Sequence, residues 1–436
     1  MTGPTGPLGE TGPQGIPGLA TNTGATGSKG EVRISGYKNS AGPVLAATLL
    51  SEEPSIISNL PQVSDVLNQI EIMSQIGCEV EWLDDHTVKI NAKNLDPQKI
   101  PFGVFQKMRV SVLLIGPLLA RFRSFRVPHP GGDKIGLRSI STHLDAFEQF
   151  GVKVWRDNDS YCFEAPKDLK PAHVILKEFS VTATENAMML AASIDGKSTI
   201  EIAAAEPQVQ DLITMLISMG AKISWSHPHT LEIDGNPKLT GASHSVCPDP
   251  LETGTFMIAL AITGGQGKIT HANTRHLTFF LEKMKEIGVN FTKTNDTITV
   301  NPSGNFKAAR VQVMLYPGFP TDLQPQISVL LTQATGKAVV NEPLYENRMR
   351  HFEELRKMGA DIEITDPHRA LIFGKTELLG TTVDASDIRS GTALTLAALI
   401  AQGQTIVDNI ANIERGSEKF DEKLRSLGAD IQKIGE

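Results

Sequence analysis

Residues 148–165, EQFGVKVWRDNDSYCFEA, contain the structural unit from which most of the chain is built. An apolar residue ends a helix, Gly151 follows in the place of a left-handed cap, and two strands then flank a polar turn. This order recurs about every 70 residues, which indicates six copies of one unit, all but the last with the second strand. The other copies are SQIGCEV at Gly77, ISMGAKI at Gly220, KEIGVNF at Gly288, RKMGADI at Gly359 and RSLGADI at Gly428.

Each unit also contains a second helix, which is rich in small and apolar residues and carries few charges. A helix that is apolar on nearly all sides lies in a core, whereas the amphipathic helix before each glycine lies outside. Three helices of each kind per half predict an α/β protein of two similar domains, residues 31–247 and 248–436, with sheets and outer helices around the buried helices. The buried helices are expected to begin near Asn39, Arg109, Val181, Thr253, Leu323 and Ser390.

The composition excludes several classes of protein. The net charge of −8 argues against nucleic acid as a partner, because phosphate backbones bind basic surfaces. No stretch approaches the roughly 18 apolar residues of a membrane-spanning helix, and no signal peptide is recognisable, so we expect a cytoplasmic protein without membrane contact. Cys78, Cys162 and Cys247 are far apart, which predicts neither disulfides nor a zinc site.

Residues 1–30 differ in composition from the rest of the chain. Glycine occupies every third position from Gly3 to Gly30, interrupted only at Thr21, and prolines stand at several positions between. This pattern is typical of collagen, whose crowded axis accepts only glycine. So few triplets would form a marginal triple helix, so we expect a disordered tail. Self-association of this tail is the alternative.

Polar and charged side chains stand at the predicted starts of the buried helices. Helix N-termini bind anions through free N–H groups and a partial positive charge, so starts that emerge on one face would form an anion site. Helix capping is the alternative for Ser180, Asp249 and Asp322 taken singly. Capping does not explain a cation at a helix start, because it opposes the dipole and calls for an anionic partner. These side chains are Lys38, Asn39, Arg109, Ser180, Asp249, Glu252, Asp322, Asp387 and Arg389.

Residues 127–143, VPHPGGDKIGLRSISTH, combine a Pro-Gly-Gly turn with groups that can transfer a proton or bind an anion. Asp133 stands beside Lys134, and Arg138 follows. Functional groups concentrate on loops, and glycine and proline give such loops unusual geometry. A surface loop without function has a similar composition. The helix starts described above favour a mobile lid over a cleft.

Six motifs occur in order along the chain: ISGYKN at 34–39, PGGDKIGLR at 130–138, FPTDLQ at 319–324, ENRMRH at 346–351, SDIR at 386–389 and IERG at 413–416. From about Gly30 to the C-terminus the chain resembles the enolpyruvyl transferases in these motifs and their spacing. The resemblance is strongest to the members that act on UDP-N-acetylglucosamine, rather than to the sister branch that acts on shikimate 3-phosphate. It implies a two-domain inside-out α/β barrel of six βαβαββ repeats with a cleft between the domains.

The resemblance also implies a reaction. The 3-hydroxyl of UDP-N-acetylglucosamine adds to C2 of phosphoenolpyruvate while C3 is protonated, and the tetrahedral intermediate then loses phosphate. This reaction is the first committed step of peptidoglycan synthesis. It needs no cofactor and no metal, because positioned cations stabilise the charge.

The motifs assign roles to individual residues. Asp322 stands where the family places the group that takes the hydroxyl proton, and Asp133, Lys38 and Arg415 complete the catalytic set. Arginine suits these sites because its planar fork binds carboxylate or phosphate through two bonds. Phosphoenolpyruvate is expected to bind to Lys38, Asn39, Arg138, Arg348, Arg389 and Arg415. The UDP-sugar contacts correspond to Arg109, Arg138, Ser139, Ile140, Ser141, Thr142, Ser180, Val181, Asp322 and Leu344.

Asp133 occupies a position that is cysteine in many family members and is linked there to proton donation or product release. A carboxyl group donates a proton only if its pKa is raised, which substrate phosphate would promote and Lys134 would oppose. We hypothesise that Asp133 is the general acid. We also expect resistance to fosfomycin, an epoxide that alkylates the cysteine, because a carboxylate is a poorer nucleophile than a thiolate.

Several positions depart from the family pattern near the nucleotide contacts. Many members have Arg-Pro-Val-Asp-Leu-His where residues 138–143 read RSISTH, a lysine at the position of Glu178 and an arginine at that of Pro250. Two alternatives follow: transfer to a different acceptor, such as another nucleotide sugar, and a catalytically silent scaffold assembled by the collagen-like tail. The nearly intact phosphoenolpyruvate set favours an enzyme. The tail also stands where the family has a first strand, so either that strand is lost or residues 29–35 supply all of it.

Overall fold

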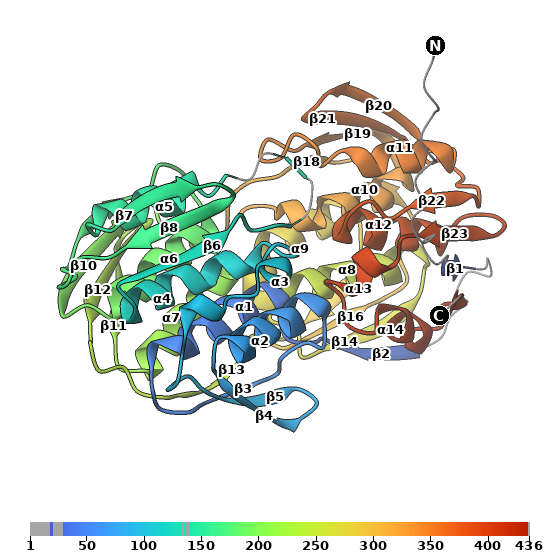
Figure 1. The fold of residues 1–436 in the computed structure, drawn as a ribbon. Coiled ribbons are helices and arrows are strands. Elements are labelled where there is room, and N and C mark those ends of the chain that lie inside the picture. The colour runs from blue at the N-terminus through green and yellow to red at the C-terminus, as the bar shows by residue number, and fades with distance from the viewer. Residues whose placement is uncertain (1–17, 21–28, 133–134, 137–138, 435–436) are drawn as a thin grey trace, which may run out of the picture.

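The computed structural model describes residues 18–20, 29–132, 135–136 and 139–434. These residues fold into two lobes, each with its own hydrophobic core, which lie side by side in Figure 1. We call them the first lobe, whose core runs from Ala41 to Val246, and the second lobe, whose core includes Leu251 to Leu427.

The described strands form six separate sheets, one for each repeated unit. The inside-out barrel arrangement that the resemblance implies stays a prediction. Five of the sheets contain the predicted hairpin. The sheets of the first lobe are β13(Ser243–Ser245)-β3(Ser55–Ser58)-β5(Thr87–Asn91)-β4(Glu79–Asp84), β6(Ser124–Pro128)-β8(Ser160–Glu164)-β7(Lys153–Asp157) and β11(Lys222–His227)-β12(Thr230–Gly235)-β10(Gly196–Glu201)-β9(His173–Ile175). Those of the second lobe are β15(Phe291–Lys293)-β16(Thr297–Val300)-β14(Gln266–Thr270)-β2(Lys29–Arg33), β17(Phe306–Lys307)-β19(Ala334–Asn341)-β21(Arg369–Gly374)-β20(Asp361–Asp366) with β18(Arg310–Gln312) on β19, and β22(Thr382–Asp384)-β23(Thr405–Asp408)-β1(Gly18–Ala20)-β24(Ile431–Lys433).

The outer helix of every unit ends at its glycine, as predicted. The φ angles of the six glycines lie between 83° and 109°, a left-handed conformation that other residues rarely adopt. The cap turns the chain from the helix into the strand that follows, so the glycines fix the repeated architecture. The outer helices are α2(Ser64–Gln75), α5(Ser141–Gln149), α7(Pro207–Ser218), α9(Thr278–Ile287), α11(Arg350–Lys357) and α14(Phe420–Ser426).

The inner helices fill the two cores. Every residue of α6(Val181–Ala192) from Ala183 onward is buried, as its small and apolar composition with few charges predicted. No helix among the described residues is long and apolar enough to cross a membrane. The other inner helices are α1(Lys38–Ala47), α4(Ile115–Arg121) after η3(Val110–Leu114), α8(Pro250–Ile262), α10(Gln324–Thr332) after η5(Thr321–Leu323) and α12(Ile388–Ala398). Short helices are η1(Thr48–Leu50), η2(Pro97–Lys99), α3(Phe102–Phe105), η4(Thr274–Leu277) and α13(Ala411–Glu414).

Two N-terminal strands complete sheets of the second lobe. β1 pairs antiparallel with both β23 and β24, so it holds the inner position that a hairpin strand holds in the other units. β2 pairs in parallel with β14. The first strand was expected either to be lost or to be supplied entirely by residues 29–35, and both expectations were incomplete because two strands form. Gly18–Ala20 also differ from the predicted disorder of the tail, because they form one of these strands. The rest of the predicted tail, residues 1–17 and 21–28, lies outside the described residues.

The chain crosses between the lobes at two adjacent points. Gly36 and Pro248 form an antiparallel bridge, and Tyr37 N–H donates to Cys247 O over 2.8 Å. A Cβ atom on Gly36 would lie 1.7 Å from Asn59 O, so only glycine fits. Val32, Ile34 and Tyr37 pack in the second core, which differs from the predicted boundary at residue 31. The first lobe thus begins at α1, whose first residue is Lys38.

Candidate active site

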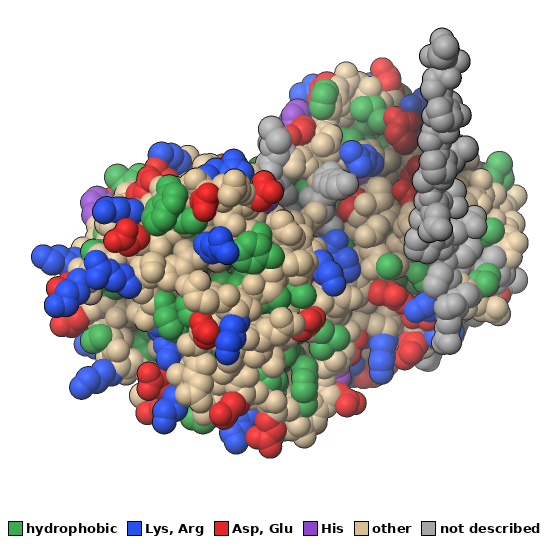
Figure 2. Space-filling view, in the orientation of Figure 1, with side chains coloured by type: hydrophobic (Ala, Val, Ile, Leu, Met, Phe, Trp, Pro, Cys, Tyr) green, Lys and Arg blue, Asp and Glu red, His purple; other side chains and the backbone are tan. Residues whose placement is uncertain are grey.

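A cavity of about 670 Å³ lies between the lobes and is lined by residues of both. Figure 2 shows Lys and Arg side chains gathered where the lobes meet. The cavity thus brings together helix starts that are more than 300 residues apart in the chain, from Lys38 to Arg389. Of the predicted site residues that are described, it is lined by Lys38, Asn39, Arg109, Ser139, Ser141, Ser180, Val181, Asp322, Leu344, Arg348, Arg389 and Arg415.

Asp322 binds two guanidinium groups on the second-lobe side of the cavity. Its Oδ1 accepts a hydrogen bond from Arg348, and its Oδ2 accepts one from Arg389 over 3.1 Å. Both arginines are buried, at 2% and 6% exposure, whereas the side chain of Asp322 is 25% exposed. The two guanidinium charges therefore depend on this carboxylate more than on water. Asp322 caps neither η5 nor α10, so the capping alternative is wrong for this residue. We call Asp322, Arg348 and Arg389 the Asp322 cluster.

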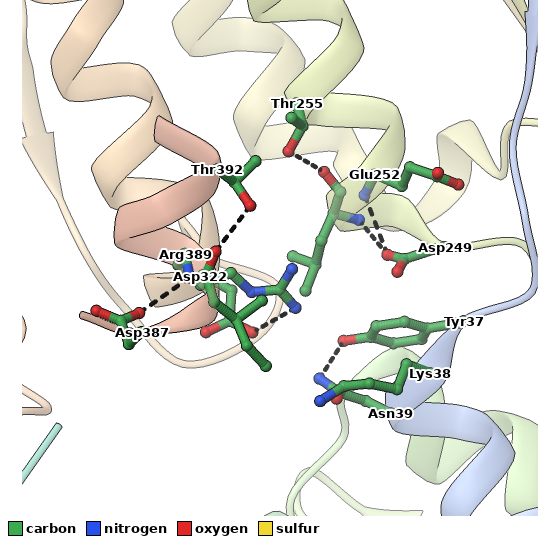
Figure 3. A network of polar contacts seen from close by, with 12 residues as sticks. Tyr37, Lys38, Asn39, Asp249, Glu252, Thr255, Asp322, Asp387, Arg389 and Thr392 are labelled. Carbon is green, nitrogen blue, oxygen red and sulfur yellow. Dashed lines mark hydrogen bonds and ion pairs between the residues drawn. The ribbon is translucent and has the colours of Figure 1, made fainter. Parts of the chain in front are cut away.

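Helix α12 fixes the position of Arg389. Asp387 caps the helix by accepting from Arg389 N–H over 2.9 Å and from Ser390 N–H over 3.2 Å. Figure 3 shows the Arg389 side chain directed from this helix start toward Asp322, opposite Tyr37, Lys38 and Asn39. A cation therefore stands at a helix start, as the sequence indicated, and a carboxylate of the protein itself offsets its charge.

The arginines also control the ionisation of Asp322. Burial alone would raise the pKa of Asp322, but the charges of Arg389, Arg348 and Lys38 outweigh burial and hold it well below its usual value. The carboxylate is therefore ionised at neutral pH.

Asp65 joins cations from the two lobes, although it was not among the predicted site residues. Lys38 Nζ donates to its Oδ2 over 2.8 Å, and Arg415 Nε donates to its Oδ1 over 3.3 Å. Lys38 and Asp65 belong to α1 and α2 of the first lobe, whereas Arg415 follows α13 of the second. Burial would raise the pKa of Asp65, but both cations lower it, so the bridge is charged at neutral pH.

The residues before and after Lys38 are also held in place. Asn39 Nδ2 donates to the Tyr37 hydroxyl over 3.1 Å. Tyr37 is 4% exposed, and burial raises the pKa of its hydroxyl, which stays neutral. The side chain of Asn39 is thereby directed to the same side of the cavity as Lys38 (Figure 3).

The described part of the loop at 127–143 reaches the second lobe. Asn347 N–H donates to Ile135 O over 3.1 Å, and a Cβ atom on Gly136 would lie 2.5 Å from the Glu346 carboxylate. Gly132 and Gly136 have φ of 123° and 153°, so the path of the loop depends on glycine. Residues 133–134 and 137–138 lie outside the described residues, so the roles of Asp133 and Arg138 remain predictions.

The segment after the loop is anchored to the first lobe. Arg109 donates to Ser139 O over 2.7 Å, and the Thr142 hydroxyl donates to Glu178 Oε1 over 2.8 Å. Ile140 packs in the first core. Neither Ile140 nor Thr142 lines the cavity, in contrast to the prediction, because a core contact and a hydrogen bond hold their side chains elsewhere.

Two of the three residues for which capping was the alternative are caps. Ser180 accepts from Ala183 N–H over 3.4 Å, and Asp249 accepts from Leu251 N–H over 2.7 Å. The capping alternative is confirmed for both, and Ser180 lines the cavity as well.

Other cavity residues besides Asp65 were also missed, among them Gln69, Glu185, Glu206 and Gln208. A signal was present for Glu185, because an acid inside an otherwise uncharged helix has to be buried. None existed for Asp65, since an acid in the first turn of an amphipathic helix is ordinary. No group of three or more His, Cys, Asp or Glu side chains among the described residues could hold a metal ion.

The two-lobed fold and the cationic cavity define the class of protein. The sequence model of EPSP synthase (3-phosphoshikimate 1-carboxyvinyltransferase) matches residues 23–424, and the chain belongs to this family of enolpyruvyl transferases. Among solved structures, it is similar to the enolpyruvyl transferase NikO from Streptomyces tendae, with a TM-score of 0.86, 25% identity and coverage of 96% of this chain and 99% of the other. EPSP synthase from Acinetobacter baumannii shares the fold, with a TM-score of 0.73, 16% identity and coverage of 96% and 99%.

Sequence relatives are more specific. UDP-N-acetylglucosamine 1-carboxyvinyltransferase of Koribacter versatilis is 42% identical over 416 residues, which is 95% of this chain and 96% of the relative. The enzyme of the same name from Helicobacter pylori is 40% identical over 410 residues, which is 94% of this chain and 97% of the relative.

Proposed function

We propose that the chain transfers the enolpyruvyl group of phosphoenolpyruvate to the 3-hydroxyl of UDP-N-acetylglucosamine and releases phosphate, a step of peptidoglycan synthesis. The observation that carries the proposal is the cation set Lys38, Arg348, Arg389 and Arg415, which lines one cavity from both lobes. Phosphoenolpyruvate bears a phosphate and a carboxylate close together, and a ring of cations suits such a trianion. The printed names of the relatives supply the acceptor.

The addition step requires a base for the hydroxyl proton, and we assign it to Asp322. Its low pKa makes it a weak base while Arg348 and Arg389 bind it. The anionic groups of phosphoenolpyruvate would compete for these guanidinium groups and add negative charge nearby. Both effects raise the pKa of Asp322 toward the range that a general base needs, so substrate binding itself would activate the base.

The chemistry then proceeds by addition and elimination. The sugar oxygen forms a bond to C2 of phosphoenolpyruvate, and C3 takes a proton. In the second step C3 loses a proton, the C2–C3 double bond reforms, and the bond from C2 to the phosphate oxygen breaks with its electron pair leaving on phosphate. Lys38 and Arg415, which Asp65 holds together across the cavity, stabilise the negative charge on the phosphate.

We assign the proton delivered to C3 to Asp133, which lies outside the described residues. The cysteine found at this position in many relatives is absent, so we expect fosfomycin to leave the enzyme active. Activity should be assayed after incubation with fosfomycin, with Asp133→Cys as the matched variant, which should lose activity over time. Rapid covalent inactivation of the unmodified enzyme would refute the resistance. An Asp133→Asn variant with unchanged turnover would refute the acid role.

A second candidate acceptor is favoured by one observation. Glu178 and Pro250, which stand where many relatives have lysine and arginine, both line the cavity. Two cations that would suit a diphosphate are thus missing from the cavity wall, which favours transfer to another nucleotide sugar.

Phosphate release from phosphoenolpyruvate, measured with a panel of UDP-sugars, separates the candidates. Release with UDP-N-acetylglucosamine supports the first proposal, release with a different acceptor supports the second, and no release with any acceptor supports a silent scaffold. A role on soluble metabolites also leads us to propose the cytoplasm as the compartment. Self-association of residues 1–30 stays a prediction.

A further inference from the structure

The first-lobe side of the cavity presents four buried oxygen atoms that have no hydrogen-bond partner among the described residues: Gln69 Oε1, Glu185 Oε1, Glu206 Oε2 and Gln208 Oε1. We call these four residues the carboxyl-amide wall, and all four line the cavity. Gln69, Glu185 and Gln208 are 0%, 1% and 7% exposed. A buried acceptor without a donor is costly, and native proteins rarely leave several together.

The wall is held rigidly by three helices. Glu185 projects from the buried helix α6, Glu206 precedes α7 and Gln208 lies in its first turn, and Gln69 belongs to α2. Gln69 Nε2 donates to Gly42 O over 2.8 Å, which fixes the amide and leaves its oxygen as the group without a partner. A ligand in the cavity that donates hydrogen bonds would supply the partners that these oxygens lack.

None of the four residues of the wall is a cation. Burial raises the pKa of Glu185 well above its usual value, and the nearby Glu206 raises it further. Burial also raises the pKa of Glu206. Glu178 adds another carboxyl group to the cavity lining. Hydroxyl and N–H groups of a ligand are the natural partners of carbonyl and carboxyl oxygens that lack a donor.

We propose that the carboxyl-amide wall binds the hydroxyl and N–H groups of the uncharged part of the nucleotide-sugar acceptor and sets the acceptor specificity of the enzyme. This inference rests on the proposed function. The wall lies in the first lobe, apart from the Asp322 cluster of the second lobe, while Lys38 and Arg415 complete the phosphoenolpyruvate cations from both lobes.

The test compares KM values for the two substrates in Glu206→Gln and Gln208→Leu. Each variant loses acceptor capacity, so KM for UDP-N-acetylglucosamine should rise about tenfold, the effect of one hydrogen bond, while KM for phosphoenolpyruvate stays within about twofold. Glu201→Gln is the matched control, because Glu201 on β10 pairs with the exposed His173 of β9 and does not line the cavity. Unchanged KM for the acceptor in both variants, or equal changes for the two substrates, would overturn the proposal.

Inhibition by UDP identifies the part of the acceptor that binds. If Glu206→Gln raises KM for UDP-N-acetylglucosamine but not the inhibition constant of UDP, the wall binds the sugar. If both rise, it binds the nucleoside, and either result supports the proposal.

Calorimetric titration with UDP-N-acetylglucosamine makes the test independent of turnover. A Kd weakened about tenfold in Glu206→Gln supports the wall even if the reaction differs from the one proposed. An unchanged Kd overturns the wall even if the enzyme is active. Absence of phosphate release with every acceptor would instead refute the proposed function.

Discussion

On the second-lobe side of the cavity, Arg348 and Arg389 both pair with the carboxylate of Asp322. On the first-lobe side, Glu185 and Glu206 have oxygens without partners. An internal ion pair can be exchanged for a substrate anion with little loss of electrostatic energy, so the Asp322 cluster is stable before substrate arrives and reactive afterward. Oxygens without partners instead gain from any donor that reaches them. The Asp322 cluster therefore binds its substrate by exchanging an internal ion pair for a pair with the substrate anion. The carboxyl-amide wall instead binds its substrate by forming hydrogen bonds that are missing in the free protein.

The largest expected effect comes from removing the charge at the centre of the Asp322 cluster. In Asp322→Asn, kcat should fall by about 10² to 10⁴, the range for loss of a general base, while the acceptor still binds the opposite wall. Steady-state kinetics with both substrates measures this, with Asp361→Asn on the exposed edge of β20 as the control. A kcat within about threefold of the unmodified value would show that the cluster does not take the proton.

A change in Arg389 tests whether the two walls bind different substrates. Arg389→Lys keeps the charge but loses the planar fork, so KM for phosphoenolpyruvate should rise about tenfold to a hundredfold with little change for the acceptor. This pattern is the mirror image of that expected for Glu206→Gln. If Arg389→Lys shifts the KM of the acceptor instead, the division of the cavity is wrong.

A smaller effect is expected at the bridge between the lobes. Asp65→Asn removes the charge that joins Lys38 to Arg415, so the lobes should separate more readily and KM for phosphoenolpyruvate should rise about tenfold with similar kcat. Small-angle X-ray scattering should show an increased radius of gyration without substrate. Glu71→Gln, on the exposed face of the same helix, is the control. An unchanged radius of gyration together with an unchanged KM for phosphoenolpyruvate would show that Asp65 does not hold the two lobes together.

The smallest effect concerns Asp249, a buried carboxyl group that interacts electrostatically with Arg389. Burial, opposed by Arg389 and assisted by Glu252, raises the pKa of Asp249 from 3.8 to about 7. The folded protein favours the neutral carboxyl group of Asp249, which contributes to the free energy of unfolding. This contribution is fully present below pH 3.8 and is lost as pH rises toward about 7. Asp249→Asn cannot ionise, so its Tm relative to the unmodified protein should increase across this window, by about 2 to 4 °C per kcal/mol. Thermal unfolding at several pH values measures the difference, and a constant difference would contradict the raised pKa.

Much of the fold was predictable because local rules repeat in it. The six glycine caps and five hairpins follow from residue types at fixed spacing, and Gly77 and Gly151 show the same left-handed geometry. The position of β1 was not predictable, because its pairing partners β23 and β24 lie almost 400 residues away and no local pattern records such a contact.

For the site, polar residues at helix starts predicted Lys38, Asp322 and Arg389. The two cations were the clearest signal, because a positive charge at a helix N-terminus is unfavourable unless an anion lies nearby. Asp65 was not predicted, because its role depends on Arg415 of the other lobe. Ile140 was predicted to contact the nucleotide sugar, but its side chain packs in the first core, and packing is not visible in the local sequence. Residues that act through tertiary neighbours carry no signal in their own segment.

The pairing of β1 with β24 has a consequence for synthesis on the ribosome. Gly18–Ala20 are made more than 400 residues before their partners Ile431–Lys433. The first lobe is built from one continuous segment and can fold as soon as β13 emerges, because its core ends at Val246. In the second lobe, β2 can pair once β14 has been made, whereas β1 has to wait for β23 and β24, so the sheet that contains β1 is completed after the first lobe has been synthesised.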